Sequence, residues 1–255
     1  SMATGQLPTQ DWISSETTRS VITALEAQGS SVRFIGGCVR DAIARRTITD
    51  IDIATPDRPG KVMELLEAAG IKAVPTGLSH GTVAAVINKK NFEITTLRRD
   101  VETDGRYATV NFTDDWLEDA KRRDFTINAM SASPDGAVFD PFDGISDLAH
   151  GRVRFIGIAH DRVKEDYLRI LRFFRFHGLF GRGDMDLKAK AACRAGAEQL
   201  QYLSGERIRN ELLKILLVAD PAKICNQMRS ELVLDKILPE AGNVKRLHFI
   251  NWLET

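Results

Sequence analysis

The chain has 255 residues, of which 43% are hydrophobic, so it is long enough to bury a sizeable core. Its 35 basic and 35 acidic residues cancel, so bulk charge does not indicate a nucleic-acid partner, and any such surface has to be local. The three cysteines form no CxxC pair, which argues against a disulfide framework or a zinc site and favours a reducing cytoplasm. No apolar run approaches the roughly 18 residues of a membrane span, so we expect no membrane contact.

The first half of the chain mixes short strand-like runs with helical ones. SVRFIGG predicts a strand that ends in a glycine turn, and VRDAIARR and PGKVMELLEAAG predict helices, the second of which stops at Gly70. Three further runs predict strands, namely DIDIAT (50–55), GTVAAVI (81–87) and NFEITTL (91–97). The polar, turn-rich stretch 98–116 predicts a loop.

Helical spacing dominates from about Tyr167 onward, and strand signals vanish. The helical runs are 165–180, 185–200 and 204–219, the last with Ser204 as its expected N-cap. The sequence therefore predicts an α+β protein, in which a head with a small mixed β-sheet flanked by helices precedes an all-helical part. We expect the head to span 11–150, a helical neck to span 151–220, and an incomplete helical body to begin at 221–255, because the chain stops soon after a new helix starts.

Two aspartates alternate with isoleucines in TDIDIA. In a strand, this alternation places Asp50 and Asp52 on one face and Ile51 and Ile53 on the other. Neighbouring carboxylates repel each other unless a cation lies between them, and Mg²⁺ is the natural partner for such oxygen ligands. The alternative interpretation is a solvated strand edge.

The residues before these aspartates favour a nucleotide site. Gly36 and Gly37 close a strand and open a helix, so backbone N–H groups can approach an anion there. Arg40, in the first turn of that helix, is within reach of a triphosphate. A glycine pair by itself can simply serve a tight turn. The combination with Arg40 and Asp-x-Asp in this order is the more specific signal.

The segment EDYLRILRFFRF carries charges on an otherwise apolar helix. Asp166, Arg169, Arg172 and Arg175 are spaced by three and so wind along one side. A helix this apolar is mostly buried, so its charges must face a partner or a wet cleft. The alternative is an internal Asp–Arg salt bridge. In the functional interpretation, a carboxylate that accepts and a guanidinium that donates complement a base edge with an amino group beside a ring nitrogen. Cytosine and adenine have that edge, and uracil and guanine invert it.

Three further polar residues have roles that the sequence does not decide. Glu93, on the predicted strand 91–97, is either a third carboxylate near the metal or an exposed strand residue. Asp124 and Asn128 lie four apart and are expected to cap or hydrogen-bond inside the fold.

These motifs resemble the tRNA nucleotidyltransferase and bacterial poly(A) polymerase family, within the polymerase-β-like nucleotidyltransferase superfamily. The resemblance covers nearly all of residues 30 to 220 in the right order. It rests on GGCVRD and DID, and continues through GLSHGTVAAV, FEITTLRRDVETDGR, DAKRRDFTINAM, DPFDGISDL, EDYLRILRFFRF and LSGERIRNELLKIL.

The resemblance also implies roles for individual residues. Asp50 and Asp52 would be the catalytic metal ligands, and Gly37, Arg40 and Arg123 would bind the nucleotide phosphates or lie in the nucleotide site. Asp166, Arg169, Arg172 and Arg175 match the helix that contacts the incoming nucleotide, and the later SGERIRNELLKIL helix would buttress it. In that family, a loop at 98–116 goes with switching from C to A addition.

The implied activity is metal-dependent, template-independent addition of C, C and A to the 3′ end of tRNA from CTP and ATP, with release of pyrophosphate. A bacterial-type poly(A) polymerase, an enzyme that adds only the terminal A, and an inactive RNA-binding module remain alternatives. The implied partners are the tRNA 3′ end, CTP, ATP and Mg²⁺, in the cytoplasm. The sequence leaves open where the tRNA body binds, whether the chain continues past Thr255, and the oligomeric state.

Overall fold

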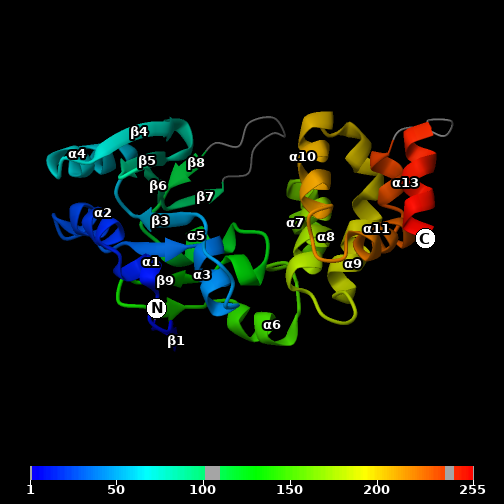
Figure 1. The fold of residues 1–255 in the computed structure, drawn as a ribbon, viewed down its shortest axis with the longest axis horizontal. Coiled ribbons are helices and arrows are strands. Elements are labelled where there is room, and N and C mark those ends of the chain that lie inside the picture. The colour runs from blue at the N-terminus through cyan, green and yellow to red at the C-terminus, as the bar shows by residue number, and fades with distance from the viewer. Residues whose placement is uncertain (1, 101–109, 239–243, 255) are drawn as a thin grey trace. The chain divides into compact units, whose positions relative to one another are not determined.

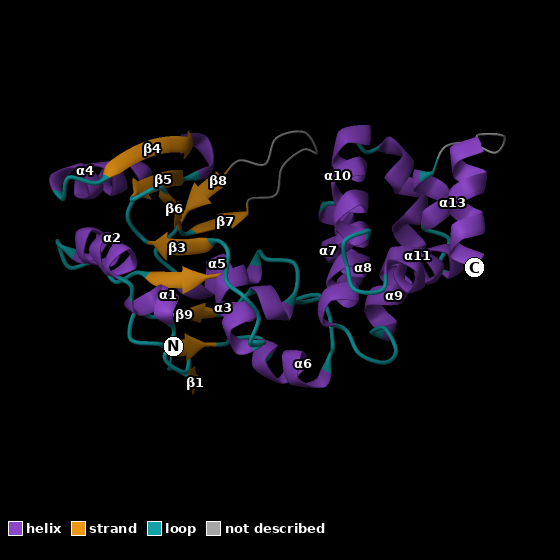
Figure 2. Ribbon diagram, in the orientation of Figure 1, coloured by secondary structure: helices purple, strands orange, loops and turns teal. Residues whose placement is uncertain are grey.

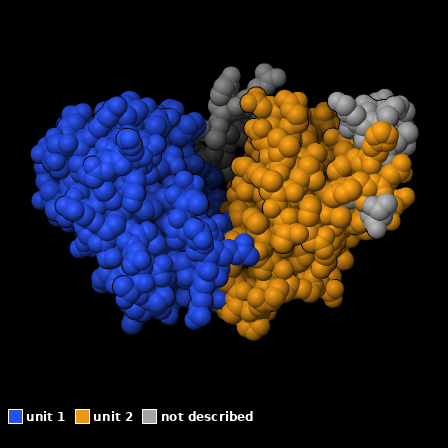
Figure 3. Space-filling model, in the orientation of Figure 1, with its two compact units in different colours: residues 1–123, 127–145 blue, residues 124–126, 146–255 orange. Residues whose placement is uncertain are grey.

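The computed structural model describes residues 2–100, 110–238 and 244–254. The chain divides into two compact units, one of residues 1–123 and 127–145 and one of residues 124–126 and 146–255 (Figure 3). The first unit thus ends a few residues before the predicted head boundary at 150. Residues 146–255 fall in one unit, so the predicted division between neck and body at 220 stays a prediction.

An eight-stranded mixed sheet forms the centre of the first unit (Figure 1). The strand order is β1-β10-β9-β2-β3-β6-β5-β4; β3 pairs with β6 in parallel, and the other neighbours are antiparallel. The mixed sheet with helices confirms the predicted α+β class. The strands are β1 (Gly5–Gln6), β2 (Arg33–Ile35), β3 (Ile51–Thr55), β4 (Lys72–Gly77), β5 (Thr82–Ile87), β6 (Lys90–Thr96), β9 (Ser131–Ala132) and β10 (Ala137–Phe139).

The predicted loop at 98–116 is partly wrong. β7 (Arg98–Asp100) pairs antiparallel with β8 (Val110–Phe112) in a separate two-stranded sheet, and α5 begins at Trp116. Residues 101–109 lie outside the described residues. The polar composition of the segment does not predict that β7 and β8 pair, because strand formation depends on the tertiary context more than on composition.

Helices flank the sheet of the first unit (Figure 2). Ile53 on β3 and Ile94 on β6 have no exposed surface, while the neighbouring Asp52 and Glu93, whose side chains point to the opposite face, stay accessible. The helical elements are α1 (Asp11–Ser14), α2 (Glu16–Glu26), α3 (Gly37–Ile43), α4 (Pro59–Ala68), η1 (Leu78–His80) and α5 (Trp116–Lys121), with η2 (Thr126–Asn128) crossing between the units.

The second unit is built of helices packed around α8 (Leu168–Phe180). Phe173 and Phe174 of α8 are fully buried, as its apolar sequence predicts. Ser204 caps α10 as predicted, because its hydroxyl accepts the Arg207 N–H at 3.3 Å. The other elements are α6 (Gly144–His150), which begins in the first unit, α7 (Ala159–Glu165), α9 (Leu187–Gly196), η3 (Ala197–Tyr202), α10 (Gly205–Ile215), α11 (Pro221–Ser230), α12 (Leu234–Ile237) and α13 (Val244–Glu254).

Within the described ranges, no helix combines the length and the apolar content that crossing a membrane requires.

Candidate active site

A glycine turn joins β2 to α3 beside the strand that carries the aspartates. Gly36 has φ of +67°, a backbone conformation that side chains with a Cβ rarely adopt, so glycine is required at this position. Gly37, the predicted phosphate-binding residue, is the first residue of α3. A Cβ built on Gly37 would lie 3.3 Å from Nη2 of Arg40. The turn therefore brings the start of α3 and the Arg40 side chain together.

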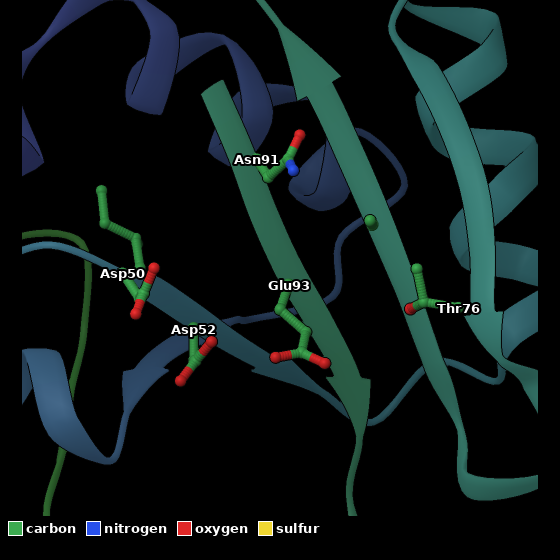
Figure 4. A pocket seen from close by; sticks show the side chains of 7 residues that line it. Asp50, Asp52, Thr76, Asn91 and Glu93 are labelled. Carbon is green, nitrogen blue, oxygen red and sulfur yellow. The ribbon is translucent and has the colours of Figure 1, made fainter. Parts of the chain in front are cut away.

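The predicted carboxylate pair lines one pocket of about 310 Å³ (Figure 4). Asp50 directly precedes β3, and Asp52 lies within it. Both line this pocket with Glu93 of the neighbouring β6 and with Ile51, and the Asp50 carboxylate is near enough to contribute to the raised pKa of Asp52, which supports the predicted placement of the two aspartates on one face. In the parallel register of β3 and β6, Asp52 is paired with Glu93, and in Figure 4 their side chains extend toward each other. Glu93 is the residue that the sequence left undecided.

Burial and the neighbouring acids raise the pKa of Asp52. Burial raises the pKa of Asp52 from 3.8 to about 6, and the nearby Glu93 and Asp50 carboxylates contribute to the rise, while Arg123 opposes it. Burial and the neighbouring acids both disfavour the charged form of this carboxylate. A cation placed among these oxygens would lower that pKa and relieve the repulsion.

The donor atoms fit a hard divalent cation, because every titratable side chain lining the pocket is a carboxylate. Among the described residues, no group of three or more His, Cys, Asp or Glu side chains is arranged so that it could hold a metal ion. A cation held by Asp50 and Asp52 would therefore need further oxygen ligands, from water or from a bound substrate.

Arg40 is held in place by two partners of the first unit. Its Nε donates to Oδ1 of Asp41 at 3.0 Å, and its Nη1 donates to Oδ1 of Asn128 at 2.7 Å. The Arg40 side chain is 14% exposed. Asn128 thus hydrogen-bonds inside the fold as predicted. Asp41 and Asn128 together orient the Arg40 guanidinium, whose role the sequence predicted only from its motif.

Arg123, the other predicted phosphate ligand of this unit, lies close enough to Asp52 to oppose the rise of its pKa. Its Nη2 donates to Oδ2 of Asp119 at 3.0 Å, and Arg122 donates to Oδ1 of the same carboxylate at 3.1 Å. Asp119 is almost fully buried. Burial and the neighbouring Arg123 lower the pKa of Arg122 to about 10, against the opposing effect of Asp119. The buried Asp119 carboxylate therefore forms ion pairs with both Arg122 and Arg123.

In the second unit, Asp166 does not lie on α8, which corrects its predicted place in a continuous helical stripe. Its backbone is extended, with φ of −157°, and its Oδ1 accepts the N–H of Leu168 at 3.1 Å, so it caps the start of the helix instead. Its Oδ2 accepts from Nη2 of Arg207 on α10 at 2.7 Å. Asp166 therefore forms an internal Asp–Arg salt bridge, as the alternative interpretation expected, and its partner is Arg207 of α10.

The three arginines of α8 contact acids from other elements. Arg169 donates to Glu165 at 2.5 Å and to the carbonyl of Arg162 at 2.9 Å. Arg172 donates through Nε to Oδ2 of Asp124 at 2.7 Å, so Asp124 bonds inside the fold as expected.

Arg175 pairs with Glu211 of α10, its Nε lying 2.9 Å from Oε2. Glu211 is 4% exposed and also lies 3.8 Å from Nη1 of Arg172. The predicted buttressing role of α10 has a physical basis in this buried acid.

Comparison with known proteins places these features in a family. A family model described as "Poly A polymerase head domain" matches residues 32–154, and one described as "Probable RNA and SrmB-binding site of polymerase A" matches residues 184–243.

Similar proteins carry related names. The chain is 45% identical over 215 residues to "CCA tRNA nucleotidyltransferase 1, mitochondrial" of Homo sapiens, covering 83% of this chain and 50% of that protein. It is 39% identical to a "CCA-adding enzyme" of Lactobacillus delbrueckii subsp. bulgaricus, covering 78% of this chain and 50% of the relative. The chain thus spans about half the length of the curated relatives it matches.

Two solved structures are similar to this chain in fold. A Bacillus stearothermophilus CCA-adding enzyme in complex with CTP matches with a TM-score of 0.77 and 34% identity, over 90% of this chain and 55% of that one. A tRNA nucleotidyltransferase complexed with a primer tRNA and an incoming ATP analog matches with a TM-score of 0.72 and 26% identity, over 91% of this chain and 66% of that one.

The glycine turn, the two aspartates at β3 and most of the mixed sheet that carries them lie within the region that matches the poly(A) polymerase head domain, so the first unit is of that class. Within that class, the chain belongs to the family of poly(A) polymerases and CCA tRNA nucleotidyltransferases.

Proposed function

We propose that this chain carries the catalytic part of a tRNA nucleotidyltransferase that adds C, C and A to the 3′ end of tRNA from CTP and ATP and releases pyrophosphate. The observation that carries the proposal is the pocket in which Asp50, Asp52 and Glu93 meet, with Arg123 close enough to influence the charge of Asp52. The names of the relatives and the CTP complex of a similar enzyme support the choice of tRNA and CTP.

In this proposal, Asp50 and Asp52 hold Mg²⁺. When bound, Mg²⁺ would lower the pKa of the RNA 3′-hydroxyl and neutralise charge on the phosphates. Arg40 and Arg123, together with the backbone at Gly37, would bind the triphosphate, because phosphoryl transfer depends mainly on positioning and charge stabilisation. Glu93 adds a third oxygen donor beside Asp52, which we now include in the site on the strength of the register between β3 and β6.

The helical part, from about 151 to 220, would select the base. Asp166 would accept from the amino group of cytosine or adenine, and Arg169 would donate to the adjacent ring nitrogen. Arg172 and Arg175 would contribute to the same nucleotide site, each held by an acid of its own unit. Uracil and guanine present a carbonyl and a ring N–H at these positions and would be rejected.

The test is a primer-extension assay with this chain, Mg²⁺, a tRNA that lacks CCA, and each nucleoside triphosphate in turn. CTP alone should extend the tRNA by two residues, and CTP with ATP by three. Products that require neither metal nor CTP would contradict the proposal. An active-site control, Asp52→Asn, should give no product.

A poly(A) polymerase is the second candidate, favoured by the description of the model that matches residues 32–154. It would produce long tails from ATP and ignore CTP, so the same gel separates the two. An enzyme that adds only the terminal A would extend tRNA ending in CC and leave shorter tRNA unchanged. A catalytically inactive RNA-binding module would bind tRNA and incorporate nothing.

We propose a cytoplasmic location, on the basis of the cysteine composition. The name of the human relative places that protein in mitochondria, so fractionation of the source cells is the deciding measurement.

A further inference from the structure

The Asp166 carboxylate is fixed at both of its oxygens. Oδ1 accepts the N–H of Leu168 at 3.1 Å, and Oδ2 accepts from Nη2 of Arg207 at 2.7 Å. The side chain remains 36% exposed, so a ligand can still reach it. A carboxylate has about four acceptor positions, so each oxygen keeps one for a further donor.

Arg207 is itself anchored at the start of α10. Its N–H donates to the capping hydroxyl of Ser204 at 3.3 Å. Glu211 lies four residues further along α10 and therefore on the same face, where it meets Arg172 and Arg175 of α8. α10 thus presents a cation opposite Asp166 and an anion opposite the α8 arginines, with one helical turn between them. This alternation sets the register of α10 along α8, which pack against each other in Figure 1.

The second contact matters because the terminal torsion of an aspartate is broad and only loosely restrained by itself. With Leu168 alone, the carboxylate plane could rotate about its single anchored oxygen. With Arg207 as well, the plane and the remaining acceptor directions are defined. Distinguishing an amino group from a carbonyl at the edge of a base depends on such orientation, because the acceptor must meet the donor in line.

We propose that Arg207 is a positioning residue for base selection: it orients the Asp166 carboxylate toward the amino group of cytosine or adenine. This inference rests on the proposed function and on the role assigned there to Asp166. Arg207 does not contact the base in this mechanism, and its effect is transmitted through Asp166.

The test measures kcat and KM for CTP, ATP and UTP, and dissociation constants for the same nucleotides by calorimetry without tRNA. For Arg207→Ala we expect the CTP-to-UTP ratio of kcat/KM to fall about fivefold, which is about 1 kcal/mol and the upper range for a partly exposed ion pair. The change should appear in KM for CTP and ATP, with kcat within about twofold, because the lost contact acts on binding and not on the reacting atoms. Arg207→Lys, which keeps a donor near Oδ2, should retain most of the ratio.

Arg209→Ala is the matched control, because it removes the same charge from an exposed position on the same helix. It should leave the ratio unchanged. In an Asp166→Ala background, Arg207→Ala should have no further effect on the ratio, whereas a purely structural Arg207 would lower thermal stability and leave the ratio of the single variant unchanged.

An unchanged CTP-to-UTP ratio in Arg207→Ala, by kinetics or by calorimetry, overturns the inference. That result is distinct from failure of the proposed function, which would appear as a wild-type chain that neither incorporates nor binds CTP and ATP.

Discussion

The carboxylate pocket of the first unit and the α8 region of the second treat charge in opposite ways. At the pocket, Asp50, Asp52 and Glu93 lie together, and the pKa of Asp52 rises to about 6. Around α8, Arg172 meets Asp124, Arg175 meets Glu211, and Asp166 meets Arg207. The first region carries surplus negative charge, and the second is nearly balanced.

The difference in charge indicates that the two regions are suited to different kinds of ligand. Surplus carboxylate charge costs stability in the free protein and is recovered when a cation binds, so the pocket is arranged for a ligand. Balanced pairs hold long side chains in defined orientations, which suits recognition of a base by shape and hydrogen bonding.

The largest effect is expected at the pocket. Asp52→Ala should reduce nucleotide addition on the order of a thousandfold or more, because removing a metal-ligand carboxylate costs several kcal/mol of transition-state stabilisation. Asp50→Ala should behave alike. Single-turnover incorporation measures the loss, and circular dichroism verifies the fold. Near wild-type incorporation by both folded variants would refute the metal assignment.

Breaking the balance around α8 should affect stability instead. Glu211→Gln leaves Arg175 and Arg172 without their shared buried acid and should lower the free energy of unfolding by about 3 kcal/mol. Urea denaturation measures it. Glu206→Gln, at an exposed position five residues earlier on α10, is the control and should change stability by no more than about 0.5 kcal/mol. Equal stabilities for the two variants would show that the buried pairs are not the basis of α10 packing.

Base choice should respond to Asp166. Asp166→Ala removes an acceptor for the amino group of cytosine and adenine, and a hydrogen bond to a charged group is worth about 1.5–3 kcal/mol. Incorporation of C and A should fall about tenfold to a hundredfold, while UTP, relieved of repulsion at O4, loses less. The CTP-to-UTP ratio of kcat/KM measures this. If the ratio does not move, Asp166 serves only as the helix cap and the partner of Arg207.

The smallest effect concerns pH and stability. Because the pKa of Asp52 is about 6 in the folded chain and 3.8 ordinarily, the folded state holds this proton more tightly, and stability from this group is lost as the pH rises from about 4 to about 6.

Asp52→Asn should therefore be more stable than wild type at pH 7.5 by about 1 kcal/mol, allowing for partial exposure, and show no such gain at pH 4. Thermal unfolding without metal tests this. Added Mg²⁺ should close the gap at pH 7.5 by stabilising only the wild type. A gain that is equal at both pH values would mean that the pKa of Asp52 is not raised in the folded chain.

Local patterns were sufficient for several of these features. The glycine turn, the shared face of Asp50 and Asp52, the Ser204 cap and the apolar α8 all follow from periodicity and from the conformational limits of single residues. Each depends on neighbours within a few positions, which is the range over which a strand or a helix repeats. The mixed α+β class followed from the same alternation of strand and helix signals.

Other features depended on long-range pairing. Glu93 lines the pocket beside Asp52 because β3 and β6 run in parallel with these two residues paired, and nothing in the local sequence of either strand specifies that register. Asp166 was misplaced on α8 because spacing by three suggests a helical stripe, whereas its capping bond to Leu168 and its ion pair with Arg207, 41 residues away, hold it before the helix. The sequence by itself determined the local elements that present the candidate site residues, such as the glycine turn, the strand of the two aspartates and the apolar α8. Which charges stand together was decided by the tertiary structure, because an ion pair depends on distance in space and its partners can lie anywhere along the chain.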